Sequence, residues 1–214
     1  MTDGLLQYSG LLAKTKALEG NLLTVQMMEA LAKAESVEEA AAILQGSPEY
    51  GQVLSGAVRI MQPEKLRRRL RKSLHQDYKR LYEFAGTRQR EELNLFVLLE
   101  KPYTRNDFRR KKVLSDRRTK EIFTRLMKEE EERKNLLFLC RKQQFAAQGA
   151  TGIPMEEIRR EQKEADRKME EIYRKLCRKY PVSIAPVCYY LYRRQKEIEA
   201  VMTAVEGVRL WSKN

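Results

Sequence analysis

Apolar residues recur along this chain at spacings of three and four, which is the pattern of amphipathic α-helices, and no segment shows the two-residue alternation of a half-buried strand. The clearest helical segment begins at Pro63 and ends near Gly86. Its apolar positions are Leu66, Leu70, Leu74, Tyr78, Leu81 and Tyr82. The prolines and glycines fall mostly between such segments. The sequence therefore predicts an all-α fold made of helices of unequal length.

Capping residues and helix breakers divide the chain into predicted helices. Thr24 stands where its hydroxyl can cap a helix, and Ser36-x-x-Glu39 is a capping box. Ser115 and Asp116 can likewise cap a new start inside a long helical region. The predicted helices cover approximately 3–19, 24–31, 36–46, 48–54, 63–86, 87–101, 106–148, 155–180 and 186–211.

One helical pattern occurs twice in the sequence, and a weaker copy follows. The two copies are Glu91, Asn94, Leu95, Leu98 and Lys101, and Glu132, Asn135, Leu136, Leu139 and Lys142. The weaker copy keeps Glu197 and ends at Gly207, with Ala200 where the others have asparagine. Such repetition is typical of a body assembled from related units. We expect a single all-α chain, 1–214, with repeat units 1–101, 102–148 and 154–214.

The repeated pattern has a physical interpretation. On a helix its glutamate, amide, second leucine and lysine follow one stripe. An amide that is buried there needs hydrogen-bond partners, and the ends of neighbouring helices are the nearest candidates. A polar group held in this way fixes the register between helices. We interpret the repeat as architectural rather than reactive; the alternative is a coincidence of common helix formers.

The charge of the chain favours an anionic partner. Its 43 basic and 30 acidic residues give a formal net charge of +13. Nucleic acid, an anionic membrane surface and an acidic protein surface all fit such an excess. The basic residues concentrate in two runs, which are Arg67–Arg69 with Arg71 and Lys72, and Arg109–Lys112 with Arg117 and Arg118. Each run is either a solvated helix face or, in a nucleic-acid-binding protein, a set of phosphate contacts.

Reactive groups do not gather into a recognisable catalytic pattern. His75 is the only histidine, which excludes sites built from two histidines, and no Gly-rich phosphate loop is present. The run Glu129–Glu132 points around its whole helix, so its members cannot all share one site, and a solvated acidic turn is favoured over a metal site. Three cysteines without a C-x-x-C predict a reducing compartment. No apolar run reaches the length of a membrane helix, so we expect a cytoplasmic protein. Because the reactive groups form no catalytic pattern, we also expect no catalytic residues, metal or cofactor.

Three stretches carry a family resemblance. The first runs from Tyr8 to Thr24 and ends in Leu22-Leu23-Thr24, the second is the pair of Glu-x-x-Asn-Leu segments, and the third is Tyr190-Leu191-x-Arg193-Arg194-Gln195-Lys196-Glu197-Ile198, closed by Gly207. They resemble the opening helix, the repeated helices and the last repeat of the C subunits of the V-type/A-type rotary ATPases and ATP synthases, whose eukaryotic counterpart is the d subunit. The chain departs from that pattern at Ala200 and Val208, and it is shorter than most members.

This resemblance implies a non-catalytic role. The C subunits of that family are sockets of three pseudo-symmetric helical lobes between the rotating central shaft and the membrane rotor ring. They carry torque during hydrogen-ion or sodium-ion transport. The resemblance therefore implies shaft subunits and the rotor ring as partners, a peripheral position at the membrane, and neither a cofactor nor a small-molecule substrate. It makes nucleic acid the less favoured partner.

Overall fold

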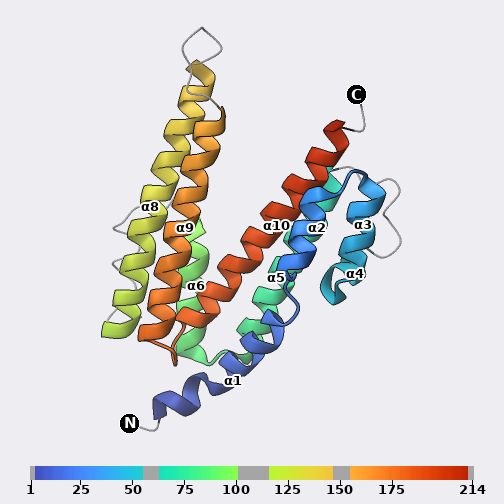
Figure 1. Cartoon of the computed structure of the whole chain (residues 1–214). Coiled ribbons are helices and arrows are strands. Elements are labelled where there is room, and N and C mark those ends of the chain that lie inside the picture. The colour runs from blue at the N-terminus through green and yellow to red at the C-terminus, as the bar shows by residue number, and fades with distance from the viewer. Residues whose placement is uncertain (1–2, 55–62, 101–115, 147–154, 212–214) are drawn as a thin grey trace. The chain divides into compact units, whose positions relative to one another are not determined.

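The computed structural model describes residues 3–54, 63–100, 116–146 and 155–211. Within these ranges the chain forms α-helices and no strand, which confirms the predicted all-α fold (Figure 1). The helices are α1 Asp3–Glu19, α2 Val25–Lys33, α3 Val37–Gln45, α4 Pro48–Leu54, α5 Pro63–Phe84, α6 Thr87–Glu100, α8 Arg117–Ala146, α9 Met155–Lys179 and α10 Ala185–Trp211. The helix predicted for 106–148 is observed only from Arg117, because 101–115 lie outside the described residues.

The helices divide into two compact units. Unit 1 consists of residues 1–8 and 86–189, and unit 2 of residues 9–85 and 190–214. Both α1 and α10 contribute residues to each unit. The three repeat units expected from the sequence stay a prediction.

Side-chain caps explain several helix starts. Thr24 Oγ1 accepts the amide of Met27 at 3.2 Å, and Ser36 Oγ accepts the amide of Glu39 at 3.0 Å. The carboxylate of Glu39 reaches back to the amide of Glu35, one residue earlier than a capping box requires. Asp116 Oδ2 accepts the amide of Thr119 at 2.9 Å and so caps α8. The caps predicted at 24, 36 and 116 are therefore confirmed.

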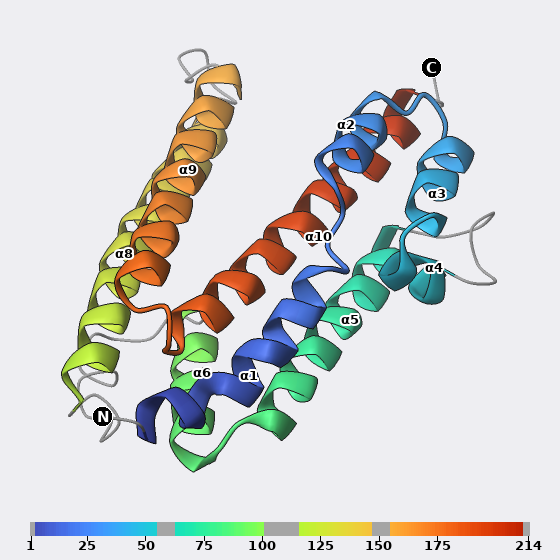
Figure 2. The same cartoon turned by 60° about the horizontal axis from the view of Figure 1, so that its bottom comes forward.

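Unit 1 is built around a long pair of antiparallel helices. α8 and α9 lie side by side along their lengths, and α6 packs against α8 (Figures 1 and 2). Their buried apolar residues include Leu93, Leu95, Phe96, Ile122, Phe123, Leu126, Met169, Tyr173 and Leu176. On α9 the buried residues recur at spacings of four and three, so one stripe of a highly charged helix provides its share of the core.

Unit 2 joins helices from distant parts of the sequence. α10 lies along α5, and the short helices α2, α3 and α4 cover them (Figure 2). One apolar cluster connects these helices and contains Leu23, Leu31, Ala34, Ala40, Leu44, Tyr50, Leu66, Leu70, Ile198, Val201, Met202 and Val205. The C-terminal helix therefore completes a core whose other residues all precede residue 71.

Candidate functional site

The most extensive polar site of unit 2 surrounds the Arg194 guanidinium in α10. Only 1% of the Arg194 side chain is exposed. Its Nη1 lies 2.5 Å from Glu197 Oε1, and its Nη2 donates to Ser73 Oγ at 3.1 Å. Its Nε lies 3.4 Å from Asp77 Oδ2 without hydrogen-bond geometry, and its Cζ lies 4.8 Å from the centre of the Tyr50 ring. The cation is thus enclosed by carboxylates, a hydroxyl and an aromatic face.

Glu197 connects three segments of unit 2. Its Oε1 accepts the Tyr50 hydroxyl of α4 at 2.8 Å, and its Oε2 accepts the backbone amide of Leu23 at 2.6 Å. With the Arg194 contact, both carboxylate oxygens are engaged. Because the three donors come from the segment before α2, from α4 and from α10, this carboxylate fixes the register of helices that are far apart in sequence.

Asp77 of α5 is the second buried carboxylate of this site. Only 1% of its side chain is exposed, and its Oδ2 accepts the Tyr190 hydroxyl at 2.9 Å. Its Oδ1 accepts Nη1 of Arg80 at 3.2 Å. The carboxylate of Glu49 lies 3.6 Å from Arg194 Nη2 and 4.0 Å from Arg80 Nη1. We call these residues the Arg194 network: Glu49, Tyr50, Ser73, Asp77, Arg80, Tyr190, Arg194 and Glu197.

Unit 1 has its own buried carboxylate at Glu92 of α6, which is fully buried. Its Oε2 accepts the Tyr8 hydroxyl at 2.5 Å, and its Oε1 accepts the Thr119 hydroxyl at 2.6 Å. Arg88 Nε lies 3.6 Å from the same Oε1, while Arg88 Nη2 lies 2.9 Å from Asp116 Oδ2. The arrangement ties α1, α6 and the start of α8 together, as Glu197 does for helices of unit 2.

Burial sets the protonation of these groups. Burial raises the pKa of Glu92 above its usual 4.5, although the hydrogen bonds from Thr119 and Tyr8 and the charge of Arg88 act in the opposite direction. Burial, reinforced by a nearby carboxylate, also raises the pKa values of Tyr8, Tyr50 and Tyr190. Each of these tyrosines therefore stays protonated and donates its hydrogen to the carboxylate beside it.

The raised pKa of Glu92 predicts a pH-dependent stability. The folded protein binds a proton at Glu92 more tightly than the unfolded chain does, so this contribution to stability is fully present below the unfolded pKa and decreases as the pH rises through the folded one. Glutamine cannot titrate. We therefore expect the free energy of unfolding of the wild type, minus that of Glu92→Gln, to fall as the pH rises from acid to neutral.

Urea unfolding at a series of pH values measures this difference. Glu91→Gln is the matched control, because Glu91 is the adjacent glutamate and its side chain is exposed. A Glu92→Gln difference that is flat, or that increases with pH, would contradict the prediction.

The first two copies of the repeated pattern keep their polar residues exposed, whereas the third copy buries its glutamate. Leu95 is buried, Leu136 is half-buried, and the polar residues Glu91, Asn94, Glu132 and Asn135 are exposed. In the third copy Glu197 and Ile198 are buried and Gly207 is half-buried in α10. Lys101 lies outside the described residues, and Lys142 lies in α8. The glutamates and asparagines of the first two copies thus lie outside the buried sites of the described residues. The architectural role proposed for these two copies stays a prediction.

Sequence reasoning missed Glu92, Asp77 and the central position of Arg194. One face of α6 is buried and contains Gln89, Glu92, Leu93 and Phe96. Glu91, the glutamate of the repeated pattern, lies about a quarter turn away from Glu92 around the helix. The available signal was a charged residue at the helical spacing of apolar ones. Arg194, for example, precedes Ile198, Val201, Met202 and Val205 on the same stripe.

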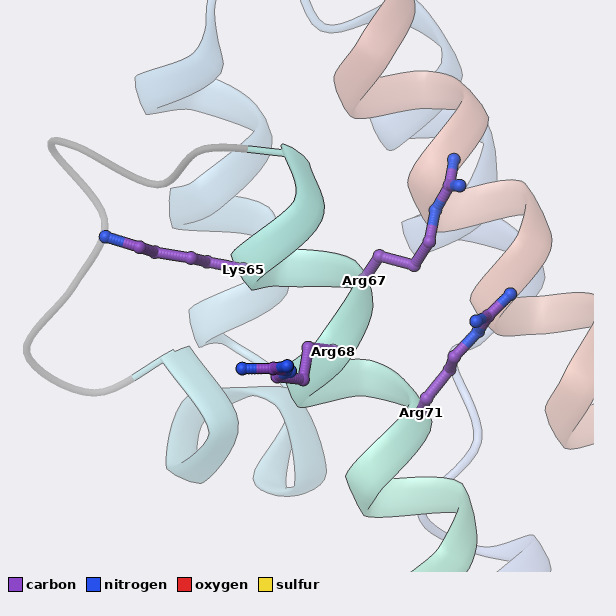
Figure 3. Close-up of a pocket in the computed structure, with 4 residues that line it drawn as sticks. All are labelled: Lys65, Arg67, Arg68 and Arg71. Carbon is purple, nitrogen blue, oxygen red and sulfur yellow. The ribbon is translucent and has the colours of Figure 1, made fainter.

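The first basic run forms an exposed face on α5. Lys65, Arg68 and Arg71 are exposed, whereas Arg67 is half-buried and its Nη2 lies 3.0 Å from Glu206 Oε1 of α10. A hollow of about 410 Å³ opens at this face, and the described residues that line it are Lys65, Arg67, Arg68 and Arg71 (Figure 3). Of the second run, residues 109–112 lie outside the described ranges, and Arg117 and Arg118 are exposed at the start of α8.

The described residues also bear on metal and membrane binding. No group of three or more His, Cys, Asp or Glu is placed among them so as to hold a metal ion. None of the helices in the described ranges has both the length and the apolar character to cross a membrane. His75 is exposed on α5, and Cys188 is buried in unit 1, where burial raises the pKa of its thiol.

Comparison with known proteins yields one family. Residues 11–104, a little less than half of the 214, match the family model described as ATP synthase (C/AC39) subunit. The match contains most of α1, all of α2–α6 and the first copy of the repeated pattern, and it does not reach the second and third copies. No curated protein and no solved structure matches the chain significantly. The resemblance inferred from the sequence is therefore confirmed over residues 11–104, which match the model of the ATP synthase (C/AC39) subunit family.

Proposed function

We propose that this chain is a non-catalytic central-stalk component of a V/A-type rotary ATPase, which links the rotating shaft to the membrane rotor ring and transmits torque during hydrogen-ion or sodium-ion transport. The observation that carries the proposal is the family match over residues 11–104, because that family is a subunit of V/A-type ATPases. Shaft subunits and the rotor ring are the proposed partners. The proposed location is the cytoplasmic side of the membrane, reached through the complex.

The interior of unit 2 supports a coupling role. A part that passes torque by contact must resist sliding between its own helices. The Arg194 network supplies such resistance, because Arg194 and Glu197 of α10 contact residues of α4 and α5 and the segment before α2. Moving any one of these helices along another would leave buried charges without partners, at a cost far above that of sliding apolar surfaces.

The buried carboxylates support a structural rather than a catalytic assignment. Glu92, Asp77 and Glu197 are the most deeply buried acidic residues of the described chain, and each accepts hydrogen bonds from side chains or backbone of its own unit. A general base needs a lone pair directed at substrate, and these oxygens are directed at internal donors. The proposal therefore assigns them to the body of the protein.

Co-purification tests the proposal. The chain, tagged and expressed at its native level, is isolated in mild detergent after nuclease treatment, and the recovered proteins are identified by mass spectrometry. We expect shaft and rotor-ring subunits of a rotary ATPase. An equally basic helical protein with the same tag is the control, because it reports recovery by charge alone. Recovery of folded tagged protein without any rotary ATPase subunit would contradict the proposal. Recovery of nucleic acid instead of these subunits would favour a basic helical nucleic-acid-binding protein.

A further inference from the structure

The exposed face of α5 concentrates like charge along fewer than two helical turns. Lys65, Arg68 and Arg71 follow one another at spacings of three, and Arg67 precedes Arg71 by four. Side chains at these spacings are neighbours on a helix, and like charges there oppose helix formation. The ion pairs of the described chain give Arg67 a partner in Glu206 but give none to Lys65, Arg68 or Arg71. An anion placed among them would relieve this repulsion.

A hollow accompanies these charges. Its volume of 410 Å³ lies in the range of small-molecule sites, and its described lining is entirely basic. In Figure 3 the side chains of Arg67 and Arg71 extend on the side of α5 that faces α10, whereas Lys65 and Arg68 extend elsewhere around the helix. The Glu206 contact holds the Arg67 guanidinium at one edge. The four side chains that line the hollow therefore extend from different sides of one helix.

The chemistry of these side chains points to phosphate. A guanidinium presents paired N–H donors that match two oxygens of one phosphate group, and three of the four lining residues are arginines. Lys65 lies in the first turn of α5, where the helix dipole also favours an anion. We propose that this hollow is a binding site for a polyphosphorylated small molecule, whose phosphates contact Lys65, Arg68 and Arg71 with Arg67 as a held fourth donor.

Size separates this ligand from other polyanions. A nucleic acid needs a basic stripe that follows the spacing of its phosphates over many residues, and its affinity depends on the number of phosphates neutralised. The hollow occupies less than two turns of one helix, so it suits a compact cluster of phosphates. The phosphates can come from a soluble molecule or from the headgroup of a phosphorylated lipid. This ligand site is independent of the torque-transmitting role.

Titration calorimetry with inositol hexakisphosphate tests the site. The variant Lys65→Gln/Arg68→Gln/Arg71→Gln removes three exposed cations of the hollow. The matched control is Arg117→Gln/Arg118→Gln/Lys120→Gln, which removes two arginines and one lysine, all exposed, from the start of α8. We expect the first variant to lose at least about tenfold in affinity and the control to stay within about twofold of the wild type. The ligand should also raise the melting temperature of the wild type and of the control.

Two further probes identify the source of the phosphates. Vesicles of phosphatidylcholine with phosphatidylinositol bisphosphate are compared with vesicles in which phosphatidylserine supplies the same charge. Selective binding to the former, lost in the hollow variant only, assigns the site to a lipid headgroup and supports the proposal. Equal losses in both triple variants, no binding of any phosphorylated probe by the wild type, or tighter binding of a single-stranded oligonucleotide than of inositol hexakisphosphate would each overturn it.

Discussion

Replacing Arg194 with alanine is expected to lower the free energy of unfolding by about 3–5 kcal/mol, which is the usual cost of removing one partner from a buried ion pair. The reason is that Asp77 and Glu197 would stay buried and lose the cation between them. The Tyr50 ring would also lose the guanidinium 4.8 Å from its centre. Urea unfolding followed by circular dichroism measures the change, provided that the slope of the transition is unaltered.

Arg193→Ala is the matched control for this experiment. Arg193 is the preceding arginine of the same helix, and its side chain is exposed. We expect that variant to stay within about 0.5 kcal/mol of the wild type, as is usual for surface substitutions. If both substitutions lowered the free energy of unfolding equally, the contribution of Arg194 to stability would come from the charge of α10 and not from its enclosed position.

Replacing Glu197 with alanine is the second large effect that we expect, again about 3–5 kcal/mol. This change removes the acceptor of the Leu23 amide and of the Tyr50 hydroxyl, and it leaves the Arg194 guanidinium without its closest carboxylate. Glu199→Ala is the control, since Glu199 is an exposed glutamate of the same helix that pairs with Lys196 at the surface. Such surface pairs contribute at most about 1 kcal/mol.

The two substitutions should not be additive. Because Arg194 and Glu197 contact each other at 2.5 Å, the double variant Arg194→Ala/Glu197→Ala should cost less than the sum of the single variants. A simple sum would contradict the direct coupling between these residues. A Glu197→Ala variant as stable as Glu199→Ala would contradict the role of this carboxylate in holding the segment before α2.

The helices were predictable because their signals are local. Periodic apolar residues, Pro63 at a helix start and the caps at Thr24, Ser36 and Asp116 each act within a few residues of chain. The Arg194 network was not predictable in this way, because Glu49, Asp77 and Arg194 are brought together only by the packing of α4, α5 and α10. In a sequence so rich in charge, only its helical spacing from Phe96 separates Glu92 from Glu91, although one is fully buried and the other is exposed.

The repeated pattern and the C-terminal stretch of the resemblance gave unequal information about the site. The pattern drew attention to Asn94 and Asn135, which the structure places on exposed faces. The C-terminal stretch that carried the resemblance contains Arg194 and Glu197, which lie at the centre of the buried network. A residue's neighbours in sequence identify the helix that it belongs to, but the face that this helix buries is decided by the helices packed against it.

Unit 2 is built from two segments that are far apart in the sequence, which has a consequence for synthesis on the ribosome. The ribosome synthesises residues 9–85 of unit 2 first and residues 86–189 of unit 1 next. The part of α10 that belongs to unit 2 is synthesised only after that. At about 5–20 residues per second, the apolar faces of α2–α5 wait on the order of 5–20 s for Ile198 and Val201. The buried charges of Asp77 and Glu49 meet Arg194 equally late, so during this interval their side chains stay in contact with water. We therefore expect residues 9–85 to expose apolar surface on the ribosome until α10 is synthesised.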